Sequence, residues 1–338
     1  MTTLPVSDDR DDLAVDPRHI SRRATGGDAV FEWSARAVGA SVLLITGGVG
    51  LFLGWQGFPT IKRYGLSFFT EEQWLPDEDR IGIAGVLVGT FSVAAVAMVI
   101  AFPLALLTAL YISEYAPARL RGFLVSMIDL MAAVPSIVYG IWGFWLIMPH
   151  AAEFARWLES NAGWLPFLQV RGSDPDAAYW DASRYYSSAF CAGIAVSMMV
   201  MPMACAVMRQ VFSQTPPGEK EAALALGATR WGMVTSVVLP FGRGGIIGGT
   251  MLALGRALGE TIAVALILSV AFEVKWNVLE TGSATISSLI ANRFGEASAS
   301  QLSALLAAGF VLFIITLLVN TAAAVIVNRS RSGAGTDA

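Results

Sequence analysis

Six long apolar segments run through this sequence, and they constrain its fold more than any other feature. Each is close to or above the roughly 20 residues that a helix needs to cross a bilayer. The segments are 37–55, 83–113, 122–148, 187–211, 240–271 and 302–327. Only 14% of the 338 residues are charged, against about 25% in a soluble domain. The sequence therefore predicts an all-α polytopic membrane protein with six transmembrane helices.

The polar segments predict the domain organisation. A transmembrane domain over 37–328 is flanked by an N-terminal tail, 1–36, and a C-terminal tail, 329–338. The segments on the side of the two tails hold more lysine and arginine than the loops on the other side, which the positive-inside rule assigns to the cytoplasm. Residues 1–36 have no early apolar core, so they do not resemble a cleaved signal peptide. We expect both termini in the cytoplasm.

Several chemistries are excluded by what the sequence lacks. Its two cysteines, Cys191 and Cys205, fall in one apolar segment, about 21 Å apart along a helix, so they cannot pair within it. With only two histidines, a metal site or a histidine-based catalytic site is not expected. No Gly-x-x-x-x-Gly-Lys-Ser/Thr phosphate loop is present. We expect no enzyme activity and no cofactor in this chain.

Two charged residues, Arg256 and Glu260, interrupt the fifth apolar segment. Arg256 comes about 24 Å along a helix that starts at Pro240, where insertion of an ion costs at least about 2.5–3.5 kcal/mol. Four-residue spacing predicts that both side chains share one helix face. Either they form an ion pair that fixes a subunit contact, or the guanidinium binds a transported oxyanion. In the second interpretation Glu260 holds Arg256 when no anion is present.

The polar segment 215–240 between the fourth and fifth apolar segments predicts a short helix. Pro216 and Pro217 favour a helix start, and Gly227 favours its end. A helix of about ten residues is marginal in water on its own. It either rests on the membrane surface or packs against a partner protein.

The residues of this segment resemble the EAA loop of ABC-transporter permeases. The resemblance is carried by Glu221-Ala222-Ala223, Gly227 and Val237-Val238-Leu239-Pro240. Gly-Arg-Ala-Leu-Gly-Glu-Thr at 255–261, with Ser-Glu-Tyr-Ala-Pro at 113–117 and Tyr-Gly-Ile-Trp-Gly at 139–143, is similar to permease subunits of phosphate-specific (Pst) ABC importers, the PstC type in particular. The resemblance covers roughly residues 80–328.

This resemblance implies a type I ABC importer permease fold in a bacterial plasma (inner) membrane. It implies a phosphate pathway that includes Arg256 and Glu260, and an ATPase coupling site at Glu221, Ala222, Ala223, Gly227, Leu239 and Pro240. The implied partners are a PstA-type permease, two PstB-type ATPase subunits that bind ATP and Mg, and an extracytoplasmic phosphate-binding protein.

Other interpretations stay open at the level of sequence. The chain fits an ABC permease for another oxyanion, a secondary transporter driven by an ion gradient, or a membrane scaffold or phosphate sensor.

Several local features also have open interpretations. The aromatic loop 149–186 is either a short amphipathic helix at the membrane interface or a docking surface. Glu114, after the second segment, either contacts the ATPase or is solvated. Pro103 is expected to bend or locally break the second segment, and Pro135 to loosen the third.

Overall fold

The computed structural model describes residues 26–177 and 179–331. Most of the two expected tails, 1–36 and 329–338, lies outside the described residues. The chain forms two compact units, 1–49 and 50–338. In the first unit the described residues form the start of helix α1, Gly26–Tyr64. Residues 26–36, which were expected in the tail, are therefore helical.

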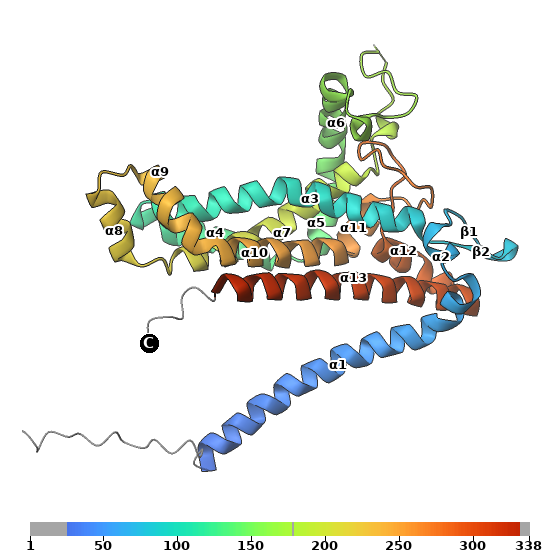
Figure 1. Ribbon diagram of the computed structural model, residues 1–338. Helices are drawn as coiled ribbons and strands as arrows, with labels where there is room; N and C mark the ends of the chain where they lie inside the picture. Colours follow the sequence, from blue (N-terminus) through green and yellow to red (C-terminus); the bar gives the residue numbers. More distant parts are fainter. Residues whose placement is uncertain (1–25, 178, 332–338) are drawn as a thin grey trace, which may run out of the picture. The chain divides into compact units, whose positions relative to one another are not determined.

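Four long helices of the second unit lie side by side (Figure 1). They are α3 (Ala84–Leu110), α7 (Ala189–Phe212), α10 (Leu239–Gly259) and α13 (Ala299–Arg331). The face of α3 that packs on α7 repeats alanine every four residues, at Ala97, Ala101, Ala105 and Ala109, all fully buried. Small residues at this spacing let helix backbones approach closely in a membrane protein.

Glycines of α10 form a second close contact with α7. A Cβ atom at Gly245 would lie 2.5 Å from Val211, and one at Gly249 would lie 3.0 Å from the carbonyl oxygen of Ala204. The first distance is shorter than real Cβ atoms show, and the second is tighter than most real Cβ contacts, so a side chain at either position would force α10 and α7 to shift. These glycines therefore serve helix packing.

The described part of the chain has five helices long and apolar enough to cross a membrane, and up to six spans if one bent pair counts as a single span. The bent pair occupies the third apolar segment. Helix α4 (Ala118–Ala133) ends before Val134 and Pro135, and the next helical stretch starts at Ser136 after a bend of 89°. A residue before proline is disfavoured in the α conformation, which explains the break. The expected effect of Pro135 on the third segment is confirmed.

The helical stretch after this bend is long and irregular. It consists of α5 (Ser136–Trp142), a π-helical turn at Gly143–Ile147 and α6 (Met148–Ala162). Helix α6 stands away from the bundle (Figure 1). The loop 149–186 therefore begins with a helix, as one of its two interpretations expects.

The fifth apolar segment is also interrupted. Helix α10 ends at Gly259, and a short helix, α11 (Ile262–Ile267), follows after Glu260 and Thr261. An unbroken span over 240–271 is therefore wrong. In contrast, α3 continues through Pro103, so the local break expected there does not occur. Proline is tolerated in membrane helices because neighbouring groups satisfy the freed carbonyl.

The remaining elements lie at the two ends of the bundle. At one end are α8 (Pro217–Ala225) and α9 (Arg230–Met233). Near the other end are α2 (Ser67–Thr70), the antiparallel pair β1 (Trp74–Leu75) and β2 (Arg80–Ile81), and α12 (Ile286–Arg293). The segment 215–240 and the loop 149–186 thus belong to different parts of the unit.

Candidate functional site

Arg256 lies in the last turn of α10, and its side chain is exposed. The free carbonyl groups at the C-terminus of a helix carry a partial negative charge, which favours a cation at this position. Within the described ranges no ion pair joins Arg256 to an acidic side chain. Its guanidinium donors are therefore available to an external acceptor.

Arg256 and Glu260 differ in burial, and among the described residues no ion pair joins them. The helix ends at Gly259, and Glu260 has an extended backbone with φ −65° and ψ 128°. The chain therefore leaves the helical path after Glu260. Glu260 is only 9% exposed, so its side chain is enclosed by the bundle, whereas Arg256 is exposed.

A hydroxyl of α12 holds the interruption at Glu260, and a hydroxyl of α3 holds the start of α12. Ser287 of α12 donates a hydrogen bond to the carbonyl oxygen of Glu260 at 2.6 Å. Thr90 of α3 accepts the backbone N–H of Ile286 at 3.0 Å. The sequence analysis missed Thr90 and Ser287. The sequence did contain a signal for the start of α12, because Thr285 and Ser288 form a capping box there.

The two interrupted spans pack against each other. A Cβ atom at Gly140 of α5 would lie 2.8 Å from the Cα of Ala263 in α11. Tyr139, the residue before Gly140, is buried and lies within electrostatic reach of Arg256. The resemblance drew on residues 139–143 and 255–261 separately, and the structure brings them together.

Helix α8 is the short helix predicted in 215–240, and much of its surface is exposed to solvent. None of its residues is buried. Glu221 and Ala222 are exposed, and Leu226 directly after the helix is 90% exposed. Gly227 has φ +89°, a conformation that side chains disfavour. The predicted stop at Gly227 is confirmed, and α8 offers an exposed surface for a partner.

Leu239 and Pro240, the other two expected coupling residues, begin α10. Leu239 packs against the main core, and Pro240 occupies the first turn, where its missing N–H is not needed. A π-helical turn at Val234–Val238 precedes them and contacts α8. The two residues therefore connect the exposed helix to the span that carries Arg256.

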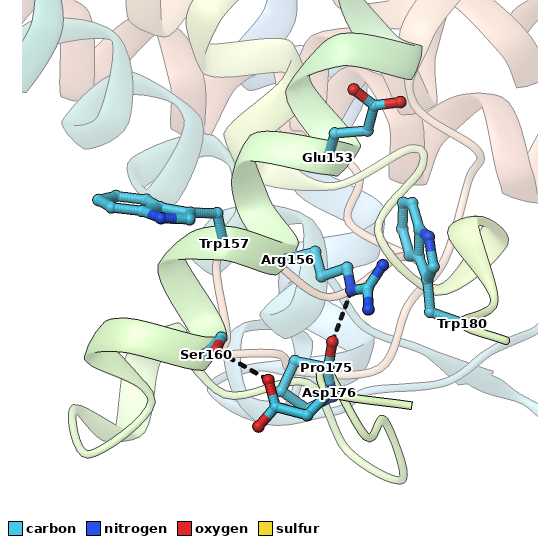
Figure 2. Close-up of a pocket in the computed structure, with 7 residues that line it drawn as sticks. All are labelled: Glu153, Arg156, Trp157, Ser160, Pro175, Asp176 and Trp180. Atoms are coloured by element: carbon cyan, nitrogen blue, oxygen red, sulfur yellow. Dashed lines mark hydrogen bonds between the residues drawn. The ribbon is translucent and has the colours of Figure 1, made fainter. Parts of the chain in front are cut away.

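The loop after α6 folds back on that helix and forms an open pocket of about 400 Å³. Figure 2 shows Arg156 of α6 beside Trp180, with its guanidinium 5.0 Å from the centre of the ring. Arg156 also donates hydrogen bonds to the carbonyl oxygens of Pro175 and Ala177, at 2.5 and 3.1 Å. The carboxylates of Glu153 and Asp176 lie on the pocket wall. We call residues 148–186 the cap.

A buried carboxylate fixes the cap from inside. Glu159 of α6 accepts hydrogen bonds from the Tyr185 hydroxyl at 2.5 Å and from the Val170 N–H at 2.8 Å. Tyr185 is fully buried. Burial and the bond to Glu159 raise the pKa of Tyr185 to about 12. The cap is therefore a folded element with its own internal polar contacts.

The described residues thus form a helical bundle of an integral membrane protein, with two interrupted spans and an exposed loop helix. Residues 101–332 match the family model described as binding-protein-dependent transport system inner membrane component. Among solved structures, a bacterial alginate ABC transporter in complex with its alginate-bound periplasmic protein shares the fold. Its TM-score is 0.57 with 17% identity, over 87% of this chain and 92% of that chain.

Two relatives match nearly the whole chain. The phosphate transport system permease protein PstC 2 of Mycobacterium tuberculosis is 38% identical over 326 residues, which are 95% of this chain and 97% of that protein. The phosphate transport system permease protein PstC of Xylella fastidiosa is 37% identical over 298 residues, 88% of this chain and 89% of that protein. The chain belongs to the PstC family of ABC importer permeases.

Proposed function

We propose that this chain is the PstC-type half of an ATP-driven importer of inorganic phosphate. The near full-length similarity to PstC permeases carries this proposal.

The proposed assembly has further subunits. A PstA-type permease supplies the other half of the translocation path. An extracytoplasmic phosphate-binding protein delivers the substrate, and two PstB-type ATPase subunits bind ATP and Mg. The assembly lies in the bacterial plasma membrane with both termini of this chain in the cytoplasm.

Arg256 and Glu260 are the proposed pathway residues. A guanidinium presents a planar set of donors that matches phosphate oxygens and stays charged at every physiological pH. The exposure of Arg256 and its lack of an acidic partner among the described residues support an anion-binding role. Glu260 is enclosed next to the helix end, where its negative charge favours release of the anion.

Helix α8 with Gly227 is the proposed docking element for an ATPase subunit. Its exposed residues, including Glu221 and Ala222, fit a helix-in-groove contact. Leu239 and Pro240 transmit the movement of the loop to α10. In this proposal ATP binding brings the ATPase subunits together, moves α8 and opens the pathway outward, and hydrolysis restores the inward-facing state. This chain makes and breaks no covalent bond.

Uptake of radiolabelled phosphate by the reconstituted assembly, with and without ATP, tests the proposal. We expect uptake only with ATP, binding protein and ATPase subunits together. Competition with sulfate and molybdate checks the substrate: either ion at equal concentration should leave phosphate uptake largely intact. Transport by this chain in liposomes without ATPase subunits would instead support a gradient-driven transporter.

A further inference from the structure

Lys220 of α8 forms an ion pair with Glu114 at the end of α3. Its Nζ atom lies 2.6 Å from Oε1 of Glu114. The Glu114 side chain is 6% exposed, and that of Lys220 is 21% exposed. Salt screens a partly buried pair much less than a solvated one. The Glu114 side chain is thus not solvated, so that interpretation of the residue is wrong, and its contact with an ATPase subunit stays a prediction.

This pair holds a helix that has few other contacts with the bundle. No residue of α8 is buried, and Ala223 is its residue that packs against the main core. The most extensive contacts of α8 with other elements are with α9 and the π-helical turn before α10, which belong to the same loop. Lys220–Glu114 therefore links α8 to a segment more than 100 residues earlier in the chain.

Glu114 is well placed to pass a displacement on to the bundle. It lies in a π-helical turn, Tyr111–Tyr115, that continues α3 without a break. Helix α3 packs along α7 and also contacts α10, the helix that carries Arg256. A pull on Glu114 thus acts on the end of a rigid element of the bundle.

We propose that the Lys220–Glu114 pair is a strut that transmits movement of α8 to α3 during transport. Both are positioning residues, and neither contacts the transported ion. The inference rests on the proposed function in one respect, namely that α8 docks on an ATPase subunit. Without the pair, an ATPase subunit still binds α8 and hydrolyses ATP, but α3 does not follow.

The test uses the complete reconstituted assembly with Lys220→Gln, Glu114→Gln and the exchanged pair Lys220→Glu with Glu114→Lys. Lys62→Gln is the control, because Lys62 is an exposed lysine outside α8. Three quantities are measured: ATPase subunits retained in mild detergent, ATP hydrolysis, and inorganic phosphate taken up per ATP hydrolysed. We expect each single variant to retain the ATPase subunits and to lower uptake per ATP by roughly fivefold or more, while Lys62→Gln resembles the native assembly.

Two further variants separate a strut from a general structural role. The double variant Lys220→Gln/Glu114→Gln should take up as much phosphate per ATP as either single variant, because the same interaction is lost in all three. The exchanged pair and Lys220→Arg should restore uptake per ATP. Additive losses, or single variants that equal the control, would overturn the proposal. A native assembly without phosphate uptake contradicts the proposed function instead. In that case hydrogen exchange at residues 111–115 still tests the strut. A change in exchange on addition of ATP that occurs in the native assembly and is lost in Lys220→Gln would support it.

Discussion

At the scale of single residues, the proposed anion pathway depends on a cation at the carbonyl end of a helix. Arg256 is exposed there, and among the described residues it has no acidic partner. A hydrogen bond to a charged group contributes about 1.5–3 kcal/mol. An arginine in this position can bind an oxyanion without first breaking an ion pair.

Replacing Arg256 with glutamine is therefore expected to lower phosphate uptake by roughly ten- to a hundredfold, which corresponds to the loss of a charge-assisted hydrogen bond. Co-purification of the ATPase subunits should be unchanged. Arg243→Gln serves as the control, since Arg243 is an exposed arginine in the same helix. Native uptake by the Arg256→Gln assembly would leave Arg256 with a structural role alone.

Tyr185 gives the cap a predictable response to alkaline pH. Its pKa is raised to about 12, above the usual value of about 10, so the neutral form is stabilised by folding. This stabilisation is complete below about pH 10 and is lost as the pH rises through about 12. Hydrogen exchange in residues 163–186 should increase over this range.

Two variants check the assignment to Tyr185. In Tyr185→Phe the alkaline step in hydrogen exchange should be absent, because no phenol remains to ionise there. Tyr179→Phe should keep the step, since Tyr179 is 97% exposed. An alkaline step that persists in Tyr185→Phe would assign the loosening to another group.

Residue identity was easier to predict than residue geometry. The sequence identified Arg256 and Glu260 as candidates because ions inside an apolar segment are rare. The four-residue spacing did not show that α10 ends at Gly259 or that Arg256 is exposed while Glu260 is buried. Thr90 and Ser287 were missed because isolated hydroxyls in apolar segments carry no distinctive pattern.

At the scale of elements, the end of α8 depends on one glycine. Gly227 has φ +89° with open space around its Cβ position, so a side chain there meets backbone strain and not a steric clash. Gly227→Val should disturb the end of α8 and reduce the amount of ATPase subunit that co-purifies in mild detergent. The strain of such a position is about 1–3 kcal/mol.

Gly65→Val is the matched control for this experiment. Gly65 also has a positive φ, +56°, with open space around it, and it lies outside the coupling loop. Its replacement should leave ATPase retention unchanged. Equal loss of the ATPase subunit in both variants would show that backbone strain in general, and not the shape of α8, controls docking.

The sequence predicted the number of spans better than their continuity. Apolar length indicated where the chain can cross a membrane, and proline at 135 indicated one break. The break after Gly259 has no proline. It depends on contacts from distant segments, such as the Ser287 hydroxyl bonded to Glu260, and hydrophobic periodicity contains no information about such contacts.

At the scale of the whole molecule, the fold predicts opposite exposure of the cap and α8. Both native cysteines are buried in α7 and can be replaced to give a background without thiols. Tyr179→Cys in the cap should then react with a membrane-impermeant thiol reagent in intact cells. Leu226→Cys after α8 should react only once the cells are permeabilised. Labelling of both sites in intact cells would contradict the proposed orientation.

The two helix interruptions have a consequence for hydration. Peptide groups that leave a helix inside a bilayer need hydrogen-bond partners from the protein or from water. Val134 and Glu260 leave their helices with extended backbones, and the short helices that follow, α5 and α11, pack on each other. We therefore expect hydration, where protein partners do not suffice, in one narrow zone of the bundle, and this zone must close between transport events to keep the membrane tight to protons.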